Sequence, residues 1–335
     1  MTWKMQRHIG KVWRLKKLGM DALYLGNRLF IGKIKREAFQ RIKQRVTDKL
    51  SGWKARLLSA VGRGTLIRAV ASSIPVYSMS TFLFPKTVSL EMDKAVRKFW
   101  WCGNAEVERC WCPVAWDSVC QPKSCGGMGF RRFAHLNRAL VAKLGWILQT
   151  DGNRLWVRAL KQMYFPHSDF IHCSPHFSSS WGWKGILKCK GIVLKGRCRK
   201  VDARDSIDIW EEPWVPWLVS NNFSQIPASP DKRQTRVSLR ELWDDSSGKW
   251  KLDALRDLFD DAYVMTIRKI QSMQGPFVNQ FVWLGNKTGK FSVKSAYLCD
   301  QKERFGDAQS RIWKIIWNMK IHERWRAGFL METFC

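Results

Sequence analysis

Acidic residues are scarce in this sequence. Its 335 residues include 58 Lys and Arg but only 28 Asp and Glu, giving a formal net charge of +30 and a pI of about 10.1. A compact fold with this surplus repels itself unless a polyanion supplies the opposite charge. Nucleic acid is the usual polyanion, because Lys and Arg displace the counterions condensed on its phosphates. An acidic membrane surface is the other candidate.

Long apolar runs are also missing. One long uncharged stretch, residues 69–85, contains Pro75 and four serines, so it is too short and too polar to cross a bilayer. The N-terminus has no apolar segment of the secretory type, and the ten cysteines therefore predict reduced thiols. We expect a nuclear or cytoplasmic protein that is not secreted and has no membrane partner. Residues 1–18 could alternatively form an amphipathic organellar presequence, although serine is absent from them.

Carboxylates and metal ligands lack the spacing that catalysis would require. Polymerases and ribonucleases H hold two Mg²⁺ ions with several converging carboxylates, whereas the two Asp pairs here, Asp244-Asp245 and Asp260-Asp261, fall in an expected turn and an expected helix. Cys and His do not repeat at zinc-ligand spacing, and no Gly-rich phosphate loop is present. We therefore predict no enzyme activity, no catalytic residue, no metal and no cofactor. The alternative to this prediction is that the chain is itself an enzyme, either a hydrolase or a polymerase.

Apolar residues recur at helical spacing through much of the chain. The clearest stripe is Phe39, Ile42, Val46 and Leu50, which predicts an amphipathic helix over 36–50. A second helix is expected between Gly64 and Pro75 with Leu66, Ala69, Val70 and Ser73 inward. Further helices are expected over 88–101, 134–149, 153–164, 251–273 and from 295 onward. The inward faces expected for the first three are Val88, Met92, Ala95 and Phe99; Leu136, Leu140, Leu144 and Ile147; and Leu155, Trp156, Ala159, Leu160 and Met163.

Two short segments favour β-structure instead. Alternation over 192–210, and apolar runs around Gly285 and Gly289, each predict a small hairpin. The predicted fold class is therefore mainly α with small β-hairpins (α+β). We expect a helical bundle-like N-terminal half and a mixed C-terminal half.

Positive charge is densest at the front of the chain. Residues 1–70 hold 18 Lys and Arg and three acids, whereas residues 200–261 carry nine bases and 13 acids. Aromatic residues are interleaved with the bases, an arrangement in which bases can stack while cations hold phosphates. The alternative is a solvated basic surface over a Trp-rich core. The candidate nucleic-acid-binding residues are Lys33, Lys35, Arg36, Arg41, Lys43, Arg45, Lys49, Lys54, Arg56, Arg63 and Arg68.

Several short phrases, in a fixed order, carry a family resemblance. They are YLG at 24–26, LSGW at 50–53, IPVY at 74–77, GGMGF at 126–130, NRAL at 137–140 and FSVKSAY at 291–297. Together they resemble the region that follows the reverse transcriptase domain in plant LINE-type non-LTR retrotransposon polyproteins, which are often labelled ribonuclease H proteins. Each phrase alone is weak, but their order makes the resemblance specific.

The resemblance implies a domain plan. Residues 1–23 would be a basic N-terminal segment and 24–164 a helical, thumb-like region that grips template–primer nucleic acid. Residues 165–230 would hold a loop, a small hairpin and a linker, and 231–335 the truncated start of the reverse-transcriptase zinc-binding domain. The paired aspartates of the polymerase would lie upstream, and the zinc ligands would follow Trp325, so neither is carried over.

The function implied is a non-catalytic fragment of such a polyprotein that binds RNA or DNA non-specifically. The alternative is a degraded, truncated product with no selected activity, or a protein-interaction remnant. Residues 196–206 depart from the WRxGxGxS turn usual in the family, which leaves the geometry of the first hairpin open. Oligomeric state and the choice between RNA and DNA stay open too.

Overall fold

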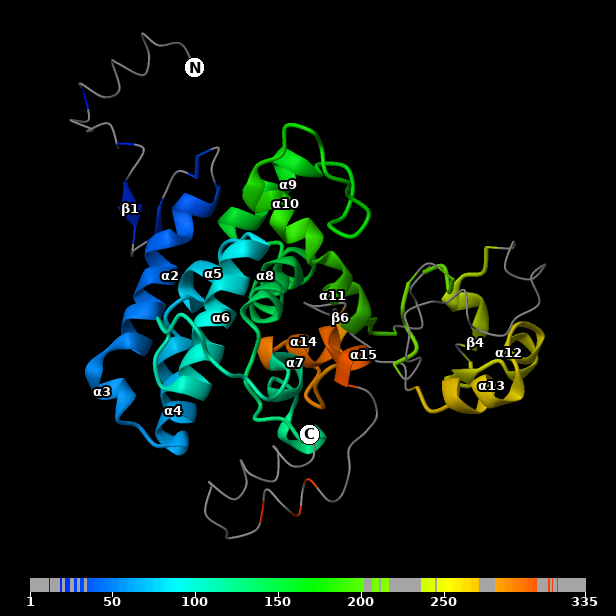
Figure 1. The fold of residues 1–335 in the computed structure, drawn as a ribbon. Coiled ribbons are helices and arrows are strands. Elements are labelled where there is room, and N and C mark those ends of the chain that lie inside the picture. Colours follow the sequence, from blue (N-terminus) through cyan, green and yellow to red (C-terminus); the bar gives the residue numbers. More distant parts are fainter. Residues whose placement is uncertain are drawn as a thin grey trace. The chain divides into compact units, whose positions relative to one another are not determined.

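The computed structural model describes most of the chain in six stretches. These are residues 35–201, 207–210, 212–216, 236–244, 246–270 and 281–305, with isolated positions near both ends. The chain divides into two compact units (Figure 1). The first comprises Met1–Ser78, Phe84–Trp116 and Ile321–Cys335, and the second Met79–Leu83 and Asp117–Lys320. In the described stretches, no helix is both long and apolar enough to cross a membrane.

The first unit is built on two long helices that pack together. Its described elements are β1 (Leu23–Tyr24), β2 (Asn27–Arg28), α2 (Lys35–Ser51), α3 (Trp53–Arg56), α4 (Ala60–Leu66), the π-helical η1 (Ile67–Ala71), α5 (Val76–Met79) and α6 (Lys86–Cys102). Helices α2 and α6 bury the stripes that their sequences predict: Phe39, Ile42, Val46 and Leu50 on α2, and Val88, Met92, Ala95 and Phe99 on α6. Both predicted helices are thus confirmed with their inward faces.

The inward face predicted for the helix before Pro75 is wrong. The helix begins at Ala60, where the Ser59 side chain caps it by accepting from the Gly62 amide. Gly64, Ile67 and Ala71 are the buried positions, whereas Ala69 is exposed. A π-helical turn is wider than an α-helical turn, so it rotates the residues after Leu66 away from the expected register.

The second unit surrounds a central helix. Its elements are α7 (Trp116–Val119), η2 (Lys123–Cys125), α8 (Phe133–Thr150), α9 (Leu155–Tyr164), α10 (Trp181–Lys188), α11 (Lys190–Gly196), β3 (Arg197–Arg199), β6 (Phe281–Trp283), α14 (Val293–Asp300) and α15 (Lys302–Phe305). Helix α8 packs against α10, α11 and α14. It therefore buries residues around most of its circumference, which a single predicted stripe does not describe. On α9, Leu155 and Met163 are exposed rather than inward.

A separate apolar core is formed by residues 201–270. Its elements are η5 (Leu239–Leu242), β4 (Trp243–Asp244), β5 (Lys249–Trp250), α12 (Leu252–Leu258) and α13 (Asp261–Ile267). Trp214, Trp250 and Leu255 are buried within it. The helix predicted over 251–273 is thus two short helices, interrupted at Phe259 and Asp260.

The fold class, mainly α with small β-hairpins, is confirmed, but the predicted hairpin pairings are wrong. Strand β3 pairs antiparallel with β6, with Cys198 opposite Val282, although about 80 residues separate them in the sequence. The alternation over 192–210 does not form a hairpin, because α11 occupies its first part. A local hairpin is found instead at β4–β5, where Gly248 adopts the left-handed φ of 65° that the turn requires.

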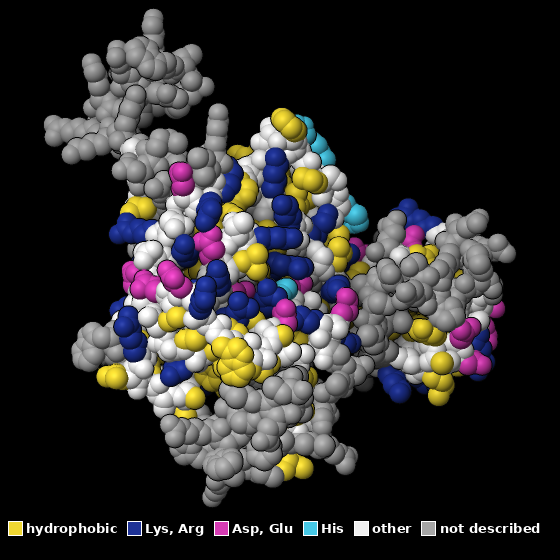
Figure 2. All heavy atoms as spheres, viewed as in Figure 1, with side chains coloured by type: hydrophobic (Ala, Val, Ile, Leu, Met, Phe, Trp, Pro, Cys, Tyr) yellow, Lys and Arg dark blue, Asp and Glu magenta, His cyan; other side chains and the backbone are white. Residues whose placement is uncertain are grey.

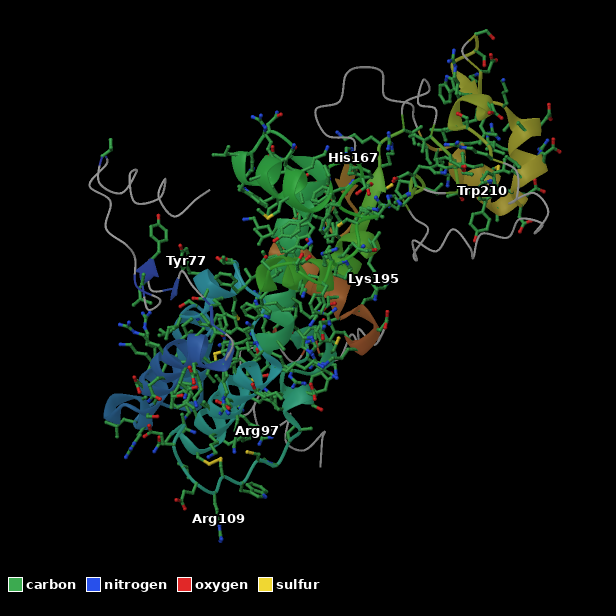
Figure 3. The ribbon with its side chains drawn as sticks, turned by 90° about the horizontal axis from the view of Figure 1, so that it is seen from above. Tyr77, Arg97, Arg109, His167, Lys195 and Trp210 are labelled. Atoms are coloured by element: carbon green, nitrogen blue, oxygen red, sulfur yellow. A yellow bond between two sulfur atoms is a disulfide. The ribbon has the colours of Figure 1, made fainter. Side chains whose placement is uncertain are left out.

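The prediction of uniformly reduced cysteines is also wrong for one pair. Cys102 and Cys110 form a disulfide, with Cα atoms 6.2 Å apart. Helix α6 ends at Gly103, whose φ of 74° reverses the chain and allows Cys110 to return to Cys102. The disulfide closes a loop that carries Arg109 on the surface (Figure 3).

Candidate nucleic-acid interface

Helix α2 carries most of the predicted binding residues, and the structure divides them between its two flanks. Arg36 and Lys43 lie on one side of the buried stripe, and Arg41, Arg45 and Lys49 on the other, as the 100° rotation per residue requires. The exposed side between them carries the acids Glu37 and Asp48. The eleven candidates therefore do not form one continuous cationic face.

Both cations of the first flank pair with one acid from α6. The Arg36 Nη2 atom lies 2.5 Å from Glu91 Oε1, and the Lys43 Nζ atom lies 3.0 Å from Glu91 Oε2. The hydrogen bond from Lys43, together with the charges of Lys43 and Arg36, holds the pKa of Glu91 below its usual range against the opposing effect of burial. These two cations are engaged in packing α2 against α6.

The second flank is an open cationic stripe. Arg41, Arg45 and Lys49 are exposed and follow one another at four-residue spacing, so they line one side of the helix over about 12 Å. Among the described residues, no ion pair involves these three side chains. They are the best-placed phosphate contacts among the predicted residues, and we call them the α2 stripe.

The remaining predicted residues are scattered. Lys35 donates to the Gly32 carbonyl at the start of α2, while Arg56 and Arg68 are exposed on α3 and η1. Lys33 and the side chain of Lys54 lie outside the described residues.

Arg63 has a structural role. Its guanidinium donates to the carbonyls of Leu58, Trp100 and Trp101 over 3.1–3.3 Å. The last carbonyls of a helix have no partner within the helix, and Arg63 supplies one at the end of α6. Its donors are thus directed at the protein backbone.

The candidate carboxylates occupy structural positions. Asp244 accepts hydrogen bonds from the Ser246 hydroxyl and amide and from the Ser247 hydroxyl, and these bonds lower its pKa to about 2. It ends strand β4, beside the turn that leads into β5, and Asp245 lies outside the described residues. In the described part of the chain, no three Cys, His, Asp or Glu side chains converge where a metal could bind.

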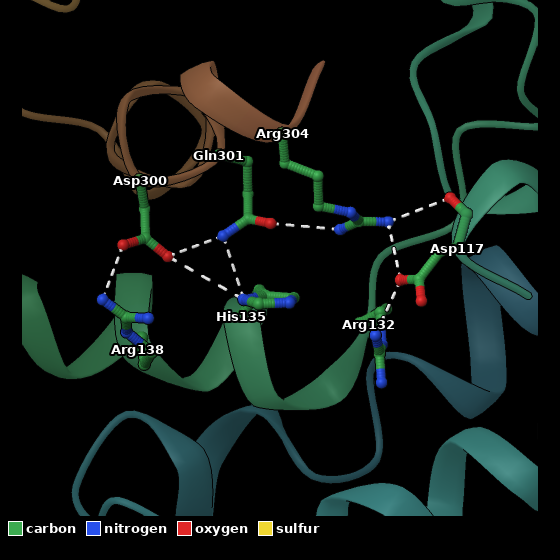
Figure 4. Close-up of polar contacts among 7 residues, drawn as sticks. All are labelled: Asp117, Arg132, His135, Arg138, Asp300, Gln301 and Arg304. Atoms are coloured by element: carbon green, nitrogen blue, oxygen red, sulfur yellow. Dashed lines mark hydrogen bonds and ion pairs between the residues drawn. The ribbon is translucent and has the colours of Figure 1, made fainter. Parts of the chain in front are cut away.

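The structure assembles a polar network in the second unit that sequence reasoning missed (Figure 4). Arg138 pairs with Asp300 at 2.7 Å, and Arg132 and Arg304 both pair with Asp117, at 2.7 and 3.2 Å. Gln301 Nε2 donates to both Asp300 Oδ2 and His135 Nδ1, at 2.8 and 2.9 Å. The three-residue spacing of Arg132, His135 and Arg138 indicates that they share one side of a helix. The sequence does not show which residues they contact, because the partners on α14 and α15 lie about 160 residues away. The network joins α7, α8 and α14–α15, so its arginines stabilise the unit.

His135 is the titratable centre of this network. Desolvation is the main reason that its pKa falls to about 4; the charges of Arg304, Arg132 and Arg138 lower it further, against Asp300. The hydrogen bond from Gln301 also requires an unprotonated Nδ1.

Acid is therefore expected to destabilise the second unit through His135. Between pH 6.5 and 4 the unfolded chain binds a proton that the folded chain does not, so the free energy of unfolding falls as pH falls through this window. The loss due to His135 is about 2 kcal/mol at pH 4.5. Urea unfolding at pH 7 and 4.5 should show a loss smaller by this amount in His135→Asn, which keeps an acceptor and cannot titrate. Equal losses in both proteins would contradict the assignment.

Comparison with known proteins identifies two relatives from Arabidopsis thaliana. One, named "Putative ribonuclease H protein", is 31% identical over 304 residues, which cover 87% of this chain and 47% of the relative. The other, named "Uncharacterized mitochondrial protein", is 31% identical over 144 residues, which cover 43% of this chain and 93% of the relative. No family model matches.

The two comparisons differ in how much of each relative they include. The chain spans about half the length of the ribonuclease H-named relative. It spans nearly all of the mitochondrial relative. The chain therefore belongs to the plant, retrotransposon-like protein family that these two relatives represent.

Proposed function

We propose that this chain is a non-catalytic, nucleic-acid-binding region of a LINE-type retrotransposon polyprotein, corresponding to the segment after the reverse transcriptase. Its partner is the phosphate backbone of RNA or DNA, bound without sequence preference, and it requires no metal or cofactor of its own. The α2 stripe carries the proposal, because it is an exposed row of three cations that no described acid neutralises.

The electrostatics of the stripe support contact with a polyanion. The four-residue spacing of Arg41, Arg45 and Lys49 presents about one cation per helical turn. A duplex carries one negative charge per ~1.7 Å of its axis, so a stripe of this length can contact several phosphates. Contacts of this kind position a protein on a duplex without reading its bases.

Reversing the three charges of the α2 stripe should weaken binding to nucleic acid and make that binding less sensitive to salt. The triple variant Arg41→Glu, Arg45→Glu, Lys49→Glu is expected to bind an RNA–DNA or DNA duplex at least ~10-fold less tightly at low salt. The slope of log K against log salt should become shallower by about 2.7, since each lost phosphate contact removes ~0.9. Fluorescence anisotropy between 50 and 200 mM salt would measure both quantities.

The matched control is a second triple variant that changes the net charge by the same amount at a different surface. Lys249, Lys251 and Arg256 are exposed and lie within the acid-rich residues 200–261, so their reversal to Glu is expected to leave the slope unchanged. Equal losses in the two triple variants would mean that net charge alone drives binding, and the α2 stripe would be rejected.

A protein-interaction remnant is the alternative function, and α9 gives it one specific observation. Leu155 and Met163, eight residues apart on this helix, are 82% and 69% exposed. Exposed apolar side chains on one helix side are typical of contact surfaces. A native chain with no salt-dependent affinity for any duplex would favour this alternative.

A further inference from the structure

A second block of positive charge lies in the second unit, outside the region that the sequence pattern singles out. Residues 117–200 contain 15 Lys and Arg and three acids, a net charge of +12. All three acids are already paired: Asp117 with Arg132 and Arg304, Asp151 with Arg154, and Asp169 with His172. Of the other cations, Arg138 pairs with Asp300, Lys195 with Glu303 and the buried Arg197 with Glu212, whereas Arg158, Lys161 and Lys188 are exposed.

Helix α9 arranges part of this surplus in a row. Arg154, Arg158 and Lys161 are exposed and lie at positions i, i+4 and i+7, so they share one side of the helix over about 10 Å. Among the described residues, the only ion pair of this row is that of Arg154 with Asp151, at 2.6 Å. Like the α2 stripe, the row places three cations on one side of a helix, but in a different unit.

The row is held on a rigid base. The Tyr164 ring stacks on Trp183 of α10 with centroids 4.6 Å apart and planes inclined by 3°, and the Tyr164 hydroxyl donates to Ser180 Oγ at 3.0 Å. Because α9 is fixed to α10 in this way, the backbone positions of its cations are set before binding, and only their side chains become ordered on binding.

Helix α10 and helix α8 extend the cationic surface. Lys188 at the end of α10 and Lys143 on α8 are exposed, and α10 packs directly on α8. Figure 2 shows Lys and Arg side chains gathered over α8, α9 and α10, whereas acidic side chains are interspersed over α2. We call Arg154, Arg158, Lys161 and Lys188 the α9 face.

We propose that the α9 face is a second nucleic-acid-binding surface, and that the chain can hold two nucleic-acid segments at once, one on each unit. This inference rests on the proposed function of the α2 stripe. An acidic membrane is the competing partner, but the apolar residues Trp156, Val157 and Leu160 of α9 pack into the core of the unit. The main apolar face of α9 is therefore turned into the protein, unlike that of an interfacial helix, and only Leu155 and Met163 are large apolar side chains exposed on it.

A bridging assay tests the inference directly. A biotinylated duplex on beads is incubated with the full chain and a second, fluorescent duplex of unrelated sequence, and the fluorescence captured through the protein is measured. The native chain is expected to capture the second duplex. The α9 variant Arg158→Glu, Lys161→Glu, Lys188→Glu should reduce capture at least ~5-fold while still binding one duplex, because the α2 stripe is intact. The Lys249, Lys251 and Arg256 reversal, with the same change in net charge, should bridge normally.

The α2 triple variant separates this inference from the proposed function. It should also lose bridging while it still binds one duplex through the α9 face. If the α9 variant bridges as well as the native chain, the second surface is refuted and the α2 proposal stands. If the α2 variant binds and bridges normally, the α2 proposal fails. If the α9 variant loses binding to phosphatidylserine-containing vesicles but captures duplexes normally, the face binds membranes and the inference is overturned.

Discussion

Replacing Asn137 with aspartate is expected to destabilise the second unit by about 4 kcal/mol, because it would bury a carboxylate against two carbonyl oxygens. Asn137 is 1% exposed, and its Nδ2 atom donates to the carbonyls of Met79 and Phe82 at 2.7 and 2.8 Å. Aspartate is nearly the same size but has no amide donor, so both hydrogen bonds are lost.

The segment that Asn137 holds explains the size of this effect. Met79–Leu83 belongs to the second unit although its neighbours in sequence belong to the first, and Leu83 packs against the core around α8. With no donor from α8, the carbonyls of Met79 and Phe82 would lose the partner that fixes this segment. Unpaired buried acceptors cost ~1–3 kcal/mol each.

The measurement is urea unfolding at pH 7, with Asn153→Asp as the control. Asn153 is exposed in the turn before α9, so the same chemical change there is expected to alter stability by less than ~0.5 kcal/mol. A similar small effect at both positions would show that the Asn137 hydrogen bonds do not stabilise the unit.

Replacing Gly196 with alanine is expected to cost about 3 kcal/mol, because the added methyl group would overlap a buried indole ring. A Cβ atom at Gly196 would lie 2.2 Å from Cη2 of Trp283. Trp283 is fully buried, its ring contacts Trp146 and Phe291, and its Nε1 donates to Ser295 Oγ at 2.8 Å. The ring has no space into which it can move.

Helix α11 supplies the matched control. Gly191 lies in the same helix, and nothing approaches within 4 Å of a Cβ placed there. Gly191→Ala should be neutral or stabilising by up to ~1 kcal/mol, since alanine is the better helix former. Thermal unfolding of the two single variants would test this contrast.

A second substitution identifies the cause of the Gly196 effect. Trp283→Phe removes the part of the ring that the new methyl group would meet. The double variant should therefore lose less stability than the sum of the two single changes. Additive losses would mean that the glycine is required for another reason, such as the end of α11.

These side chains also explain the phrases on which the family resemblance depends. Asn137 is the first residue of the NRAL phrase, and Ser295 lies within FSVKSAY. Both phrases are packing motifs in this structure: one fixes the 79–83 segment and the other holds Trp283.

The sequence by itself determined the helical class and the faces of its strongest helices. The stripes of α2 and α6 were predictable because an amphipathic pattern depends only on neighbours within a few residues. The position of Arg41, Arg45 and Lys49 on one side of α2 followed from the same spacing, and so that part of the candidate interface could be read without a structure.

The tertiary structure decided what depends on residues that are distant in sequence. Glu91 pairs with both Arg36 and Lys43. Strand Arg197–Arg199 pairs with the distant strand Phe281–Trp283 rather than with a local one, and Asp300 and Gln301 complete the network of His135. Local pattern carries no information on which distant partner a strand or a charge will meet. Which cations remain open to a polyanion is therefore a property of the fold, because ion pairs within the protein remove some of them first.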